Sequence, residues 1–124
     1  MSPYRSLAPG LFELSPLIRY VAVNQDRQIV EMEQSSRWPS HNPAETDRME
    51  ELVVNPAILE LAIRRGVLDL EGVRYVVIRY GPQYQVLFPY RAGHVSIGVE
   101  LEADVSEVAE LVLGKLEAQP SAAE

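Results

Sequence analysis

The chain has 124 residues, 47% hydrophobic and 23% charged, which is the composition of one globular domain. Its formal net charge of −7 disfavours nucleic acid as a partner, because phosphate backbones are bound by basic surfaces. Cysteine is absent, which excludes disulfides, thiol nucleophiles and thiolate metal sites. No uncharged apolar run reaches the roughly 18 residues of a membrane span, and the start lacks the pattern of a secretory leader. We therefore expect a cytoplasmic protein with no membrane partner.

The first segment, residues 1–16, contains Pro3, Pro9, Gly10 and Pro16. Residues that precede proline avoid helical angles, so we expect a poorly structured N-terminal segment with at most one turn. The next two runs, 17–23 and 28–33, are rich in β-branched or alternating residues and are separated by the turn formers of 24–27. They predict a hairpin whose second arm lies near a sheet edge.

Residues 34–44 are polar and predict a loop, in which the role of Trp38 stays open. Asp47, with Glu50 three positions later, predicts the start of a helix. Asn55 and Pro56 form a good start for a second helical piece, and Gly66 is a good stop. The sequence therefore predicts two helical pieces that meet near 54–56.

Three strand-like runs follow at 73–80, 84–90 and 94–101, joined by links so short that neighbouring strands must be antiparallel. Alternation places Val86 and Phe88 on one face of the middle strand, and Val95 and Ile97 on one face of the last, opposite His94. A final amphipathic helix is predicted from its N-cap Asp104 and an apolar stripe, and residues 118–124 are expected to form a flexible tail.

The element order is therefore β-β-α-β-β-β-α. We expect an α/β (α+β) domain at 17–117 with one five-stranded antiparallel sheet and helices on both faces.

This order, together with the strand 93–102 that runs into a C-terminal amphipathic helix, resembles the roadblock (dynein-light-chain-like) family of the profilin-like and longin-like fold group. The resemblance covers most of 17–117 and rests on topology. It implies a homodimer or heterodimer whose interface is formed by the helix at 57–63 and the strand at 73–80. It also implies a non-catalytic regulator or scaffold of Ras-like small GTPases.

The residues themselves support an interface in the same place. The helix at 56–66 is apolar on more sides than one sheet contact can cover, and the meander is rich in arginine and tyrosine, which are favoured at protein interfaces. Burial within one chain and ordinary packing of the tyrosines are the alternatives. The predicted interface residues are Ile58, Leu59, Ala62, Ile63, Arg74, Tyr75, Ile78 and Tyr80.

Two chemical constellations are weaker hypotheses. His94 and Ser96 share a strand face and, with Glu100, contain the residue types of a hydrolase, but residues two apart along a strand are about 6.5 Å apart. His41 with Glu45 and Asp47 contains ligands for a hard metal ion, an arrangement that is common by chance. We expect no catalytic residues, no metal and no cofactor.

One further class stays open as an alternative function. A small-ligand sensor of PAS- or GAF-like type would hold a ligand between its sheet and the loop at 34–44. A ligand that co-purifies with the protein would favour it over an interaction module.

Overall fold

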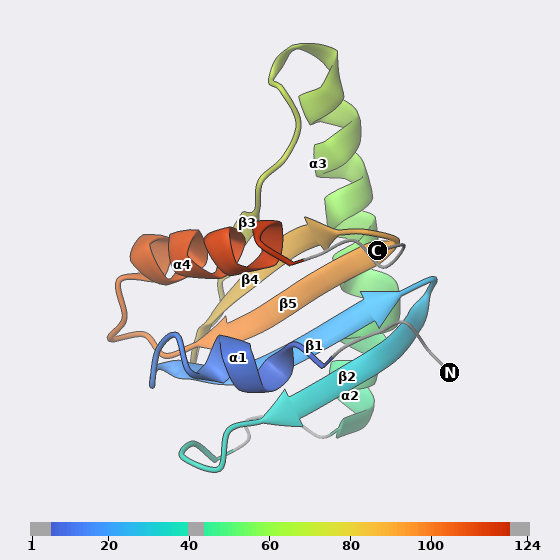
Figure 1. The fold of residues 1–124 in the computed structure, drawn as a ribbon. Coiled ribbons are helices and arrows are strands. Elements are labelled where there is room, and N and C mark those ends of the chain that lie inside the picture. Colours follow the sequence, from blue (N-terminus) through green and yellow to red (C-terminus); the bar gives the residue numbers. More distant parts are fainter. Residues whose placement is uncertain (1–5, 40–43, 120–124) are drawn as a thin grey trace.

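A computed structural model describes residues 6–39 and 44–119 and contains a five-stranded antiparallel sheet in the order β2-β1-β5-β4-β3 (Figure 1). The strands are β1 Ile18–Gln25, β2 Gln28–Gln34, β3 Val76–Arg79, β4 Tyr84–Tyr90 and β5 Gly93–Val99. The helices are α1 Ala8–Phe12, α2 Ala44–Met49, the π-helix η1 Glu50–Val54, α3 Asn55–Asp69 and α4 Val105–Glu117. The predicted strand count, antiparallel pairing and fold class are confirmed.

One face of the sheet carries the main apolar core beneath α1 and α4 (Figure 1). The predicted alternation is confirmed here, since Val86, Phe88, Val95 and Ile97 are all fully buried in this core. Each such side chain contributes about 1.5–3 kcal/mol when removed from water. The helix α4 begins as predicted, with the Asp104 side chain accepting a 3.1 Å hydrogen bond from the Glu107 amide.

The N-terminal segment is more ordered than expected. Residues 8–12 form α1, and Leu7, Ala8 and Leu11 are buried against the sheet. Pro9 lies in the first turn, where a missing N–H costs nothing. The Glu31 carboxylate on β2 accepts hydrogen bonds from the amides of Leu7 (2.8 Å) and Ala8 (3.2 Å). The expectation for 1–16 is therefore wrong over α1, while residues 1–5 lie outside the described chain.

On the other face, α2, η1 and α3 follow one another as one helical segment from Ala44 to Asp69. The two predicted pieces are joined because the π-helical turn ends at Val54 and Pro56 lies in the first turn of α3, where it needs no N–H partner. The predicted N-cap Asn55 instead has helical angles and a buried side chain. The helical segment also starts at Ala44, before the predicted Asp47.

Gly66 was predicted to stop the helix, but α3 continues for three more residues to Asp69. A Cβ at Gly66 would lie 3.1 Å from the backbone carbonyl carbon of Gly72, whose amide donates a 3.1 Å hydrogen bond to the Gly66 carbonyl. The absence of a side chain at Gly66 therefore allows the returning chain to approach the helix closely. Because the returning segment follows α3, β3 begins at Val76 and not at the predicted Val73. The end of α3 and the return segment project beyond the sheet (Figure 1).

The loop after β2 is attached to the sheet. Trp38 Nε1 donates a 3.0 Å hydrogen bond to the Pro16 carbonyl, and the buried Arg19 bonds to both the Pro39 carbonyl and the Glu100 carboxylate. Trp38 thus anchors its own loop. Within 6–39 and 44–119, none of the helices has the length and apolar character of a membrane span.

Candidate functional site

A carboxylate is buried between the π-helical turn and the sheet. Glu51 is fully buried, and its Oε2 atom accepts hydrogen bonds from Ser96 Oγ (2.6 Å) and Tyr20 Oη (2.9 Å). Its Oε1 atom lies 2.8 Å from His94 Nε2 and accepts a 3.2 Å hydrogen bond from the side-chain amide (Nδ2) of Asn55. Four partners from β1, β5 and α3 therefore converge on one side chain.

These contacts make Glu51 a structural link between the helical segment and the sheet. Burial, followed by the neighbouring Glu51 charge, raises the pKa of Tyr20 well above its ordinary value, so this hydroxyl stays protonated and donates. π-Helical turns interrupt regular helices and are frequent at functional positions. Here the turn directs Glu51 into the sheet, which fixes the helical segment on β1 and β5.

The hydrolase hypothesis meets a geometric obstacle at this cluster. His94 and Ser96 do share a face, but both are bound to Glu51, and Ser96 is fully buried. The predicted acid Glu100 instead pairs with Arg19. A nucleophile needs both a base and access to substrate, and Ser96 has a carboxylate where that base would act.

The metal hypothesis can be followed only in part, because His41 lies outside the described residues. Asp47 is buried, whereas Glu45 is exposed. Across 6–39 and 44–119, no three histidine or acidic side chains come together as a metal site.

The predicted interface residues occupy two neighbouring elements, α3 and the β3 region. Leu59 is 4% exposed and packs within its own chain, whereas Ile63 is 37% exposed and Ile58 and Ala62 are half-buried.

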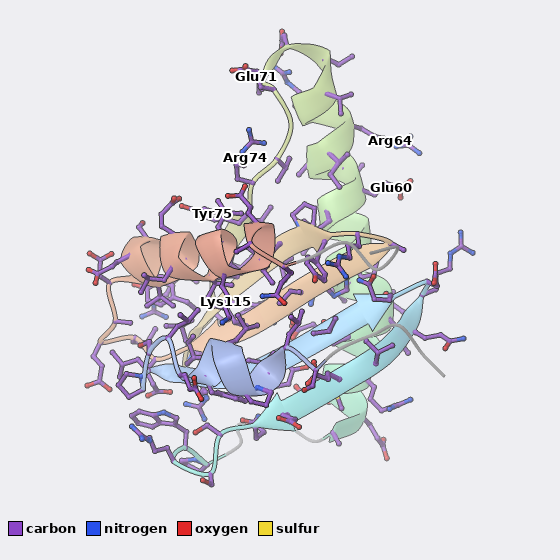
Figure 2. The ribbon with its side chains drawn as sticks, in the orientation of Figure 1. Glu60, Arg64, Glu71, Arg74, Tyr75 and Lys115 are labelled. Atoms are coloured by element: carbon purple, nitrogen blue, oxygen red, sulfur yellow. The ribbon has the colours of Figure 1, made fainter. Side chains whose placement is uncertain are left out.

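In the β3 region Arg74 and Tyr80 are exposed, and Tyr75 and Ile78 are half-buried. Tyr75 points toward α4, where its hydroxyl donates a 2.7 Å hydrogen bond to Glu110 (Figure 2). Leu59 and Tyr75 thus already have partners inside the chain.

More exposed apolar side chains lie on α3 outside the predicted set. Leu61 is 70% exposed and Leu68 is 76% exposed, seven residues apart and so on one side of the helix. The strand β3 pairs with β4 alone among the described strands, which leaves its outer edge unpaired. We name Leu61, Leu68 and the outer edge of β3 the α3–β3 surface. The apolar character of the predicted helix 56–66 on most sides was the signal for Leu61, whereas Leu68 lies beyond the predicted end at Gly66.

Glu50, in the π-helical turn, and Tyr80, which follows β3, interact, and the pKa of each is raised. Burial, followed by the charges of Glu51 and Asp47, raises the pKa of Glu50 to about 7, although the hydrogen bond from Tyr80 opposes this shift. Burial and Glu50 in turn raise the pKa of Tyr80. Glu50 in the π-helical turn therefore interacts with Tyr80, which directly follows β3.

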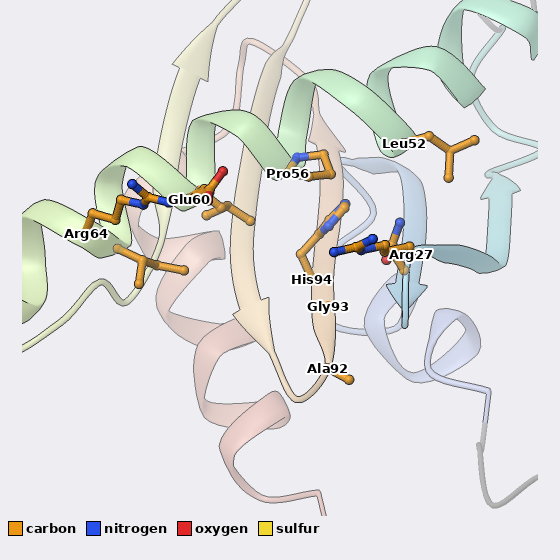
Figure 3. Close-up of a pocket in the computed structure, with 11 residues that line it drawn as sticks. Arg27, Leu52, Pro56, Glu60, Arg64, Ala92, Gly93 and His94 are labelled. Carbon is orange, nitrogen blue, oxygen red and sulfur yellow. Dashed lines mark hydrogen bonds and ion pairs between the residues drawn. The ribbon is translucent and has the colours of Figure 1, made fainter.

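A groove of about 470 Å³ lies along α3 near the turns that join β1 to β2 and β4 to β5 (Figure 3). The side chains of Leu52, Pro56, Leu59 and Ile63 form its apolar wall. Its polar groups are Asn24, Arg27, the paired Glu60 and Arg64, and the buried His94.

Comparison with known proteins identifies the fold. No family model matches the sequence, and no curated protein matches it. Among solved structures, a roadblock/LC7 domain from Streptomyces avermitilis superposes with a TM-score of 0.63 at 15% identity, covering 88% of this chain and 90% of that one. An MglB structure with a tetrameric arrangement gives 0.60 at 14% identity over 94% and 92%. The gliding protein MglB from Thermus thermophilus gives 0.63 at 15% identity over 93% and 84%. The chain therefore has the roadblock-like fold.

Proposed function

We propose that this protein is a non-catalytic interaction module that forms a homodimer through the α3–β3 surface and acts as a regulator or scaffold of a Ras-like small GTPase. The observations that carry the proposal are the exposure of Leu61 and Leu68 on α3 and the outer edge of β3, which is unpaired among the described strands. Contiguous exposed apolar side chains mark contact sites, and an unpaired strand edge offers backbone donors and acceptors to a second chain.

The absence of a catalytic role in this proposal rests on the cluster around Glu51. The histidine and serine that chemistry would require are bound to a buried carboxylate, and this cluster holds the helical segment on the sheet. The GTPase as partner class rests on the resemblance to the roadblock family, which the fold supports.

Cysteine cross-linking tests the dimer, because the natural chain has no cysteine that would interfere. A two-fold interface brings equivalent positions of two copies together, so single cysteines at Ile58, Leu61 and Arg65 are tested for disulfide formation under mild oxidation. The matched control is Leu111→Cys, a 45% exposed leucine on α4. We expect a cross-linked dimer from at least one α3 position and none from the control; equal cross-linking at all positions would contradict the interface.

The partner class needs a separate measurement. Ras-like GTPases from the same organism are loaded with GDP or with a slowly hydrolysed GTP analogue, and their binding to the immobilised protein is measured. We expect one of them to bind in a nucleotide-dependent manner. Binding by none of them in either state would remove the GTPase from the proposal while leaving the dimer intact.

A further inference from the structure

The groove along α3 is separate from the α3–β3 surface. Leu61 and Ile63 are two positions apart, and residues two apart in a helix point to nearly opposite sides. Leu61 belongs to the α3–β3 surface, whereas Ile63 lines the groove together with Leu52 and Pro56. The groove is formed by residues of one chain, so binding of a ligand there does not require the proposed dimer.

The rim of the groove is held rigidly by two turns. The Asp26 amide donates a 3.1 Å hydrogen bond to the Ala92 carbonyl, and the Gln25 side-chain amide donates a 2.9 Å bond to the Tyr90 carbonyl. A Cβ at Gly93 would lie 1.9 Å from the Asn24 carbonyl oxygen, so the absence of a side chain there lets the strands approach. A rim fixed in this way needs little reorganisation to bind a ligand.

Arg27 occupies a strained position on this rim. Its φ is 66°, in the left-handed region that favours glycine, and the preceding Asp26 has a φ of 53°. The Arg27 side chain lies in the groove beside His94 (Figure 3). Among the described residues Arg27 has no hydrogen-bond or ion-pair partner, whereas Arg64 is paired with Glu60 at 2.9 Å. These angles are those of the two-residue turn between β1 and β2, and the exposed Arg27 side chain, which has no partner among the described residues, is available to a ligand in the groove.

The shape of the groove favours an elongated ligand. Its wall runs from Leu52 to Arg64, which at about 1.5 Å per helical residue is roughly 18 Å. Leu52 is 42% exposed and Ile63 is 37% exposed, so the wall is open to solvent toward both ends, while Leu59 between them is buried. An open apolar groove beside a helix is a common way to bind a peptide segment, and an unpaired arginine adds a preference for a carboxylate.

We propose that this groove binds a peptide segment of a partner protein in which large apolar side chains are adjacent to a carboxylate, with Arg27 as the group that pairs with the carboxylate. The apolar wall provides affinity for the apolar side chains. Because Arg64 in the groove is paired with Glu60, Arg27 is the positive charge that has no partner among the described residues, and it provides the selection for acid.

Selection from a random dodecapeptide library tests this proposal. The targets are the full chain, Arg27→Gln and the matched control Arg37→Gln, whose exposed arginine follows the far end of β2. We expect the wild type and Arg37→Gln to enrich peptides with Asp or Glu next to a large apolar residue. The leading peptide should bind Arg27→Gln and Ile63→Asn about ten-fold more weakly, as expected for one charge-assisted contact or one apolar contact.

Two further results separate binding from folding. Arg27→Gly relieves the left-handed strain, so its melting temperature should equal or exceed that of the wild type while its affinity for the peptide falls. Enrichment without acidic residues, or equal affinity for wild type and Arg27→Gln, would overturn the proposal. A molar mass that rises with concentration for wild type and not for Arg27→Gln would also overturn it, because the occupant would then be a second copy of the chain.

Discussion

Ser96 Oγ donates a 2.6 Å hydrogen bond to Glu51 Oε2 and thereby joins the middle of β5 to the π-helical turn 45 residues earlier in the sequence. Both residues are fully buried, so neither can exchange this bond for one to water. The orientation of α3, and with it both the α3–β3 surface and the groove, depends on this link.

The first prediction concerns this link. Glu51→Ala leaves the donors of Tyr20, Ser96 and Asn55 buried without an acceptor, and a loss of about 3–5 kcal/mol in the free energy of unfolding is expected. Urea unfolding measures the change, with the exposed Glu45→Ala in the same helical segment as the control. A loss below about 1 kcal/mol would show that the cluster does not hold the segment on the sheet.

The second prediction concerns pH. Because the pKa of Glu50 rises from 4.5 to about 7 on folding, the native state keeps a proton that the unfolded chain has released over this interval. The contribution of Glu50 to stability is therefore present below pH 4.5 and is lost as the pH rises through about 7. Glu50→Gln should match the wild type near pH 4 and exceed it by on the order of 2 kcal/mol at pH 8.

Melting temperatures across this pH range, with Glu45→Gln as the control, check the second prediction. Parallel pH profiles for wild type and Glu50→Gln would show that Glu50 titrates in the folded state as it does in the unfolded chain.

The third prediction compares two helical glycines. Replacement of glycine by alanine in an exposed helix stabilises by about 0.5–1 kcal/mol. Gly114 in α4 has open space at its Cβ position, so Gly114→Ala should be more stable than wild type. A Cβ at Gly66 meets three backbone atoms of Gly72 at 3.1–3.3 Å, so Gly66→Ala should be less stable. Equal stabilisation of both variants in thermal unfolding would contradict the role of Gly66 in the return of the chain.

The sheet and its faces were predictable because strand alternation is local. Val86 and Phe88 point to one face in any register of that strand, and the same holds for Val95 and Ile97. Helix α1 was missed because Pro9 was interpreted as a breaker, although proline is tolerated in a first turn. The extension of α3 past Gly66 was missed because a contact with Gly72 and a helix stop both require glycine.

The buried cluster around Glu51 could not be predicted from local sequence patterns. Glu51 follows another glutamate in a helical segment and has the sequence appearance of a solvated residue. Its contacts with His94 and Ser96 span more than 40 residues and require the π-helical turn, for which the sequence has no clear signal. The arginine on the groove was missed for a related reason, because Asp26 and Arg27 are read as ordinary turn residues until their angles are known.

The molar mass in solution tests the central claim most directly. Light scattering is measured on wild type, on Leu61→Glu and on Leu111→Glu, whose altered leucine is exposed on the opposite face of the sheet. A charge in an apolar interface disrupts it, whereas the same charge in water costs little. The account predicts about 28 kDa for wild type and Leu111→Glu, twice the 13.9 kDa of one chain, and 13.9 kDa for a folded Leu61→Glu. A monomeric wild type, or a Leu61→Glu variant that stays dimeric, would contradict it.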